Sequence, residues 1–134
     1  MEAMAELIAA ARAARENAYA PYSHYAVGAA VRAEDGSIHA GCNVENAASP
    51  EGLCAEAAAI AAMVAAGRRR LTAVAVVGGD AARPAMPCGG CRQRLQEFAA
   101  PGTVVAVADA AGRLLREVPL AALLPEAFGP GDRI

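Results

Sequence analysis

A seven-residue stretch with almost only apolar side chains, Leu71 to Val77, constrains the fold of this chain most strongly. A strand that lacks polar alternation is typical of a position covered on both faces. Such a strand lies near the middle of its sheet, and helices have to pack on either side of it. The stretch therefore predicts a layered α/β structure.

The segments around this strand supply the other elements in the order α-β-β-α-β-α-β-β-α. Leu7 and Ile8 mark the apolar face of an amphipathic first helix, Asp35-Gly36 indicates a hairpin turn, and Gly67 ends the second helix. We expect helices over 4–18, 54–66, 88–98 and 120–124, and strands over 27–32, 38–43, 71–77, 103–108 and 114–118. The predicted fold is a three-layer α/β/α arrangement with a mixed five-stranded sheet.

Length and charge limit the organisation of the chain and its partners. The 134 residues, of which 56% are hydrophobic, are enough for a single domain over 1–134 with a real core. A net charge of −2 provides no surplus of cations for broad nucleic-acid binding. We find no secretory or membrane-spanning pattern, and so expect a cytoplasmic protein whose cysteines are not disulfides.

Three cysteines and one glutamate stand at the starts of two predicted helices. Cys54 and Glu56 open the second helix, and Cys88 and Cys91 open the third, directly after Pro87. A helix N-terminus stabilises negative charge through its free N–H groups and lowers the pKa of a thiol. If the two helix starts meet over one sheet, three thiolates would face one cation.

The number of sulfur ligands decides which kind of zinc site this would be. Zinc prefers four tetrahedral ligands, and a site with three protein ligands keeps one position open for water. Cys54, Cys88 and Cys91 supply three ligands, provided that Cys42 stays outside the shell. Thiolates return charge to the metal and weaken its activation of water, so a nearby base is needed. Glu56, two residues from a ligand, is placed for that role.

The same residues permit other interpretations. A Cys-x-x-Cys pair is also a redox motif, although here a third cysteine lies upstream. All four cysteines could close a structural zinc site, or the thiols could simply fill the core. Asn43 to Asn46 is also typical of a solvated turn, and Tyr25 and Phe128 are also compatible with core packing.

Five segments together resemble the small homotetrameric cytidine deaminases, and the resemblance covers about residues 18–128. The segments are 18–30 (AYAPYSHYAVGAA), 41–46 (GCNVEN), 54–56 (CAE), 87–93 (PCGGCRQ) and 123–128 (LLPEAF). The combination of Cys-Ala-Glu with a later Pro-Cys-x-x-Cys is the zinc motif of the deaminase superfamily. The flanking segments mark the branch that acts on nucleosides.

The resemblance implies one zinc ion per subunit, bound by three cysteines, and a glutamate that shuttles protons. The zinc ligands would be Cys54, Cys88 and Cys91, and the shuttle would be Glu56. Asn43 and Glu45 would hold the ribose hydroxyls. Tyr25 would lie against the pyrimidine pocket, Ala55 would contact substrate, and Phe128 would enter the site of a neighbouring subunit in a homotetramer.

The implied reaction is hydrolytic deamination of cytidine and 2′-deoxycytidine to the uridine forms, with release of ammonia, as in pyrimidine salvage. Related enzymes act on cytosine nucleoside antibiotics such as blasticidin S but generally differ in the ribose-binding segment. The intact Asn43 and Glu45 therefore favour an ordinary nucleoside. The alternative function that is not enzymatic is a structural zinc module in which all four cysteines are ligands.

Three positions depart from the family pattern. Ser49 stands where an aromatic residue is common, Met86 replaces a frequent serine before Pro87, and the third departure concerns the zinc site. Many members carry Arg directly after the catalytic glutamate, where it can hydrogen-bond the zinc thiolates, but this chain has Ala57 there. Zinc with three thiolates is net negative. We expect helix dipoles and another arginine, such as Arg92, to offset this charge.

Overall fold

The sheet of the protein is built around the apolar stretch described above. In the computed structural model, which describes residues 2–133, the strands are β1 (Gly28–Ala33), β2 (Ile38–Cys42), β3 (Leu71–Val77), β4 (Ala99–Ala108) and β5 (Leu114–Pro119). They lie in the order β2-β1-β3-β4-β5, so β3 is central, as predicted. The β3–β4 pair is parallel and the other three pairs are antiparallel, which makes the sheet mixed.

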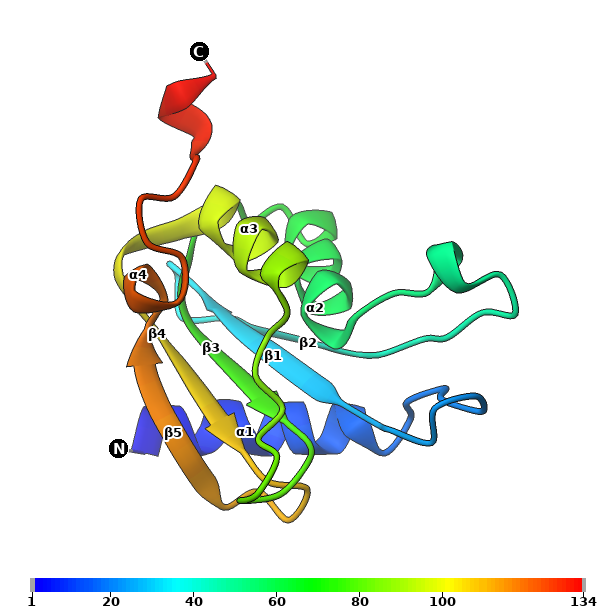
Figure 1. The fold of residues 1–134 in the computed structure, drawn as a ribbon. Helices are drawn as coiled ribbons and strands as arrows, with labels where there is room; N and C mark the ends of the chain where they lie inside the picture. The colour runs from blue at the N-terminus through cyan, green and yellow to red at the C-terminus, as the bar shows by residue number, and fades with distance from the viewer. Residues whose placement is uncertain (1, 134) are drawn as a thin grey trace.

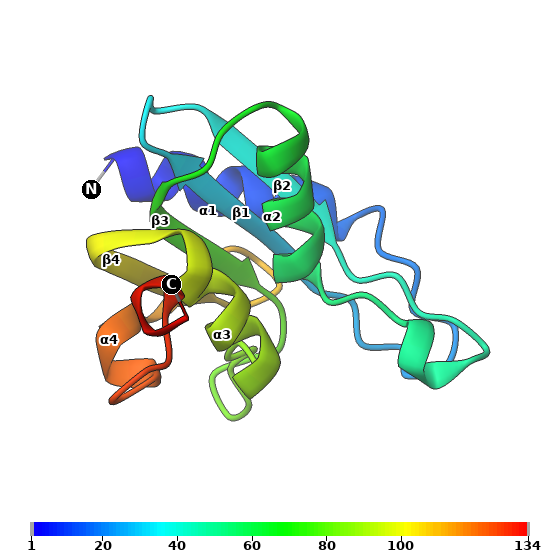
Figure 2. The ribbon, with the colours of Figure 1, turned by 90° about the horizontal axis from the view of Figure 1, so that it is seen from above.

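Helices cover both faces of this sheet and complete the predicted three-layer fold. They are α1 (Glu2–Arg15), α2 (Ala55–Ala65), α3 (Gly89–Phe98) and α4 (Leu120–Leu123), with short 3₁₀ turns at Ser49–Glu51 and Pro130–Asp132. α1 lies on one face, and α2 and α3 lie side by side on the opposite face (Figure 1 and Figure 2). Within residues 2–133, no helix has both the length and the apolar character needed to cross a membrane.

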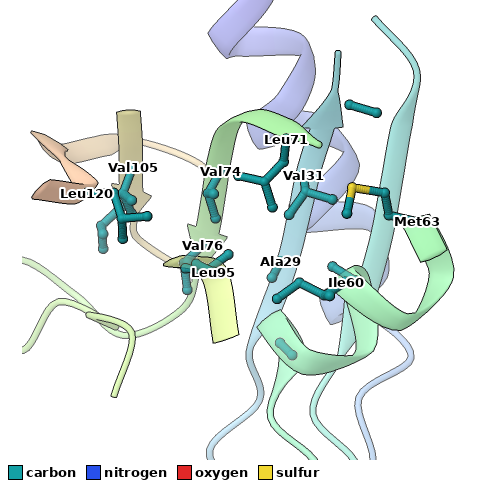
Figure 3. Packing of buried hydrophobic residues seen from close by; sticks show 14 of the residues in the cluster. Ala29, Val31, Ile60, Met63, Leu71, Val74, Val76, Leu95, Val105 and Leu120 are labelled. Atoms are coloured by element: carbon teal, nitrogen blue, oxygen red, sulfur yellow. The ribbon is translucent and has the colours of Figure 1, made fainter. Parts of the chain in front are cut away.

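Each face of the sheet carries its own apolar core. On the face toward α2 and α3, Val31, Val74 and Val105 pack with Met63 and Leu95 (Figure 3). On the face toward α1, the sheet presents mainly small side chains. The buried residues of this second core come from α1 and from the strands, and they are Leu7, Ile8, Ala11, Ala30, Ala75, Val77, Ala106 and Ala108. Burial of apolar surface on the first of these faces therefore fixes α2 and α3, which carry the cysteines, to the sheet.

Two elements differ from their predicted bounds by more than one residue at an end. α1 ends at Arg15 because the chain turns there, and the Arg15 side chain donates a hydrogen bond to the Ala26 carbonyl at 2.9 Å. β4 begins four residues before the predicted start, since Ala99 pairs with Leu71. The register then shifts before Val104, in a segment where Gly102 adopts a φ of 81°.

Two loops extend together beyond the sheet and form an arm. Residues 17–27 and 43–54 run side by side there, as Figure 1 and Figure 2 show, and bridges join Tyr19 to Val44 and Val44 to Leu53. The arm exposes large apolar side chains, namely Tyr19, Tyr22, Tyr25, Val44 and Leu53. Residues 129–133 project separately, beyond α3 and α4 (Figure 1).

Candidate active site

Three cysteines meet where α2 and α3 begin. Cys54 is the N-cap of α2, Cys88 is the N-cap of α3, and Cys91 lies in the first turn of α3. Their sulfur atoms all lie within 4.8 Å of one another, and we call these three residues the cysteine cluster. Cys42, at the end of β2, does not belong to the cluster. The structure thus joins the three cysteines that the sequence singles out.

The cysteine cluster fits zinc. Thiolates are soft ligands that zinc prefers, and a Zn–S distance of about 2.3 Å places tetrahedral sulfurs roughly 3.8 Å apart. Sulfurs that already lie within 4.8 Å of one another need only small side-chain movements to reach that spacing. Three sulfurs leave one of the four tetrahedral positions open to a small molecule.

The three thiols differ in how readily they ionise. A backbone N–H group of Cys91 donates a hydrogen bond to the Cys88 sulfur and lowers the pKa of that thiol. Burial raises the pKa of Cys54 and Cys91 instead. Cys88 is therefore the thiol best prepared to meet a cation as thiolate, as expected of a sulfur at a helix N-terminus.

Glu56 lies in a pocket beside the cysteine cluster. Its side chain belongs to the first turn of α2 and is only 5% exposed. Burial raises its pKa above the ordinary value for glutamate, against smaller opposing effects that include the charge of Arg94. The pocket has a volume of about 320 Å³ and is lined by Tyr25, Val27, Asn43, Cys54, Ala55, Glu56, Val76, Pro84, Ala85, Met86 and Cys88. A buried carboxylate thus shares a cavity with two of the three thiols.

Asn43 and Tyr25 line the same pocket, from the arm side. The Asn43 amide nitrogen donates to the Tyr25 carbonyl at 2.8 Å, and its oxygen accepts from the Val27 N–H at 2.9 Å. Asn43 therefore fixes the backbone that carries Tyr25. Ala55, at the start of α2, is buried against the pocket.

Glu45 and Phe128 lie outside this pocket. Glu45 accepts hydrogen bonds from the Tyr22 and Ser23 N–H groups at 2.9 and 3.1 Å, and from the Ser23 hydroxyl, within a neighbouring pocket. The Ser23 hydroxyl is the main reason that the pKa of Glu45 is lowered. Phe128 is 57% exposed beyond α4, and its carbonyl accepts from Gln93. The folded chain alone does not bring these two residues to the cysteine cluster.

The arginine at the cluster is not the expected one. Arg92 donates to the backbone carbonyls of Pro87 at 2.7 Å and Leu123 at 3.1 Å, and so braces the loop before α3 against α4. Arg94 instead donates to the Cys91 sulfur at 3.6 Å. The sequence signal for this contact is the three-residue spacing from Cys91, which places both side chains on one helix face.

Comparison with known proteins identifies the family. Residues 1–107 match the family model described as the cytidine and deoxycytidylate deaminase zinc-binding region. The chain belongs to this deaminase family. Together with the cysteine cluster, membership identifies the protein as a hydrolase whose cofactor is zinc.

Relatives in this deaminase family resemble the chain over nearly its whole length. The cytidine deaminase of Sporosarcina psychrophila is 45% identical over 127 residues, which are 95% of this chain and 92% of the relative. That of Halalkalibacterium halodurans is 43% identical over 94% of each chain. The crystal structure of the Burkholderia pseudomallei cytidine deaminase superposes with a TM-score of 0.83 at 46% identity, over 92% of this chain and 97% of that one.

Proposed function

We propose that Glu56 and the cysteine cluster carry out the hydrolytic deamination of cytidine and 2′-deoxycytidine. The observation that supports this assignment is the buried carboxylate of Glu56 in the same pocket as the thiols of Cys54 and Cys88. A redox pair or core thiols would have no need of such a carboxylate. The chain covers most of the length of relatives that are named cytidine deaminases.

In this mechanism Glu56 moves the protons. When bound by the cysteine cluster, zinc supplies a Lewis acid that makes water more acidic. Glu56 takes a proton from the attacking water and passes it to ring N3 as the water oxygen bonds to C4. Glu56 then takes the second proton from the oxygen now bonded to C4 and passes it to the amino nitrogen. The C4–N bond breaks, the C4=O bond forms, and ammonia leaves. Burial raises the pKa of Glu56, which favours a carboxyl group that both accepts and returns a proton.

Substrate recognition is assigned to the arm side of the pocket. We assign the ribose hydroxyls to Asn43 and Glu45, whose oxygens can accept further hydrogen bonds beyond those within the chain. Tyr25 provides an aromatic wall for the pyrimidine, and Ala55 lies at the floor. A site of this kind favours a nucleoside over a free base, since only the nucleoside can donate its sugar hydroxyls to Asn43 and Glu45.

A zinc count on purified protein, together with an absorbance assay on cytidine and 2′-deoxycytidine, tests the proposed function. We expect one zinc per chain and turnover of both nucleosides. Blasticidin S is compared as substrate in the same assay, because antibiotic deaminases share the zinc motif. Single-stranded DNA should give no gel shift, in line with the net charge of −2. Zinc-loaded protein that leaves both nucleosides unchanged would contradict the proposal.

Cys42→Ser separates a three-cysteine site from a closed four-cysteine site. Because Cys42 is not part of the cysteine cluster, we expect the variant to retain one zinc per chain and nearly full activity. The measurements are metal content by mass spectrometry and the cytidine assay. Cys42→Ser protein that loses its zinc would instead favour a structural module with four sulfur ligands.

We also propose that the enzyme assembles as a homotetramer in which Phe128 reaches the site of a neighbouring subunit. Phe128 is exposed in the single chain, and the arm presents further exposed apolar side chains such as Tyr19, Tyr22 and Val44. Clustered apolar surface of this kind is typical of protein interfaces. The assembly would be a single-domain enzyme of pyrimidine salvage in the cytoplasm.

Mixing two inactive variants tests the shared site. We expect Phe128→Ala and Glu56→Gln subunits to regain activity when they exchange, because some mixed sites combine an intact Phe128 with an intact Glu56. Activity is measured before and after exchange, and native mass spectrometry confirms that mixed assemblies form. Mixed assemblies with no more activity than the two separate variants would show that Phe128 does not act across subunits.

A further inference from the structure

Arg94 lies beside the cysteine cluster. It lies one turn after Cys91 on α3, and its Nη1 atom donates a hydrogen bond to the Cys91 sulfur at 3.6 Å. A Cβ atom on Gly90 would stand 3.4 Å from the same nitrogen, so the guanidinium lies close over the Gly90 position at the start of α3. The contact brings a permanent positive charge to the cysteine cluster.

The metal centre needs such a charge. Zinc carries two positive charges and three thiolates carry three negative ones, so the centre is net negative, and the Glu56 carboxylate adds to this. On α2, position 57 is Ala57 and provides no cation. Arg92 is held by two backbone carbonyls. Within residues 2–133, Arg94 is the arginine that donates a hydrogen bond to one of the three sulfurs.

We infer that Arg94 offsets the negative charge of the zinc–thiolate centre from α3, in a chain whose position 57 carries no cation. A charge-assisted hydrogen bond draws electron density from the Cys91 sulfur, so less is returned to the metal. Arg94 is thus a positioning residue that acts through Cys91. This inference rests on the proposed zinc-dependent function.

Zinc retention tests the inference without reference to turnover. Arg94→Gln should release zinc to a chromophoric chelator roughly 10–100-fold faster than the unaltered protein, the range usual for loss of a group that supports a metal ligand. In cobalt-substituted protein, the thiolate-to-cobalt absorption should shift. The matched control is Arg12→Gln, which removes an exposed arginine from α1 on the opposite face of the sheet and should change neither readout.

Two variants restore a cation by different routes. Arg94→Lys returns the charge at the same position, and Ala57→Arg in the Arg94→Gln background supplies it from α2. Either variant should restore slow zinc release. Either should also restore kcat toward that of the unaltered protein, while KM stays nearly constant because Arg94 does not line the substrate pocket. The inference that Arg94 acts through its charge is contradicted if Arg94→Gln releases zinc as slowly as the Arg12→Gln control. It is also contradicted if neither Arg94→Lys nor Ala57→Arg in the Arg94→Gln background restores zinc retention. Unaltered protein without zinc or cytidine turnover would count against the proposed function instead.

Discussion

Glu56→Gln is expected to keep zinc bound but to lower kcat for cytidine by at least about 10²-fold, the usual minimum contribution of a positioned acid–base group. The amide has nearly the same shape as the carboxylate but cannot accept and return a proton. Glu56 is only 5% exposed, so bulk water has little access to replace it. The measurement is kcat on protein whose zinc content is determined in the same sample.

Glu51→Gln is the matched control for this change. Glu51 lies in the exposed 3₁₀ turn of the arm, and the same substitution there should leave kcat within about twofold, because surface changes rarely disturb a distant site. A zinc-loaded Glu56→Gln sample with activity close to that of Glu51→Gln would remove Glu56 from the mechanism.

Gly28→Ala is expected to lower the free energy of unfolding by about 3 kcal/mol, at the upper end of the usual cost of overpacking. A Cβ at this position would lie 1.9 Å from the Ala11 carbonyl oxygen and 2.7 Å from the Arg15 backbone nitrogen. Both atoms belong to the backbone of α1, so no side chain can rotate away. The helix has to move off the sheet, and its buried residues Leu7 and Ile8 move with it.

Urea unfolding followed by circular dichroism measures this loss, with Gly131→Ala as the control. A Cβ added at Gly131 would meet no atom within 4 Å, so that variant should differ from the unaltered protein by no more than about 0.5 kcal/mol. Equal stability of the two variants would mean that α1 does not lie as close to β1 as described.

Gly41 has the corresponding role on the opposite face. A Cβ there would lie 2.5 Å from the Ala58 side chain and 2.6 Å from the Ala59 nitrogen of α2. The close approach of α2 to β2 sets the depth at which Cys54 and Glu56 stand over the sheet. A glycine in a strand could not be assigned this role from the sequence, because a close approach involves a segment far away along the chain.

Local patterns along the chain were enough to predict the order of the elements, the central place of β3 and the meeting of three cysteines at two helix starts. These patterns are short-range: an apolar run without alternation, and cysteines at helix starts that follow proline-containing loops. Cys54, Cys88 and Cys91 meet because the first turns of α2 and α3 lie next to each other, and Glu56 shares the adjoining pocket.

Packing between distant segments, in contrast, determines which arginine faces the sulfurs and which candidate residues share the pocket. Arg92 is four residues from Cys88 and Arg94 is three from Cys91, so spacing along the helix permits either contact. Two residues are about 200° of rotation on an α-helix, so the two side chains leave α3 in nearly opposite directions. Packing of α3 against α4 turns Arg92 toward Leu123 and leaves Arg94 at the cluster. Such rotation depends on contacts between segments far apart in the chain, which no local pattern encodes.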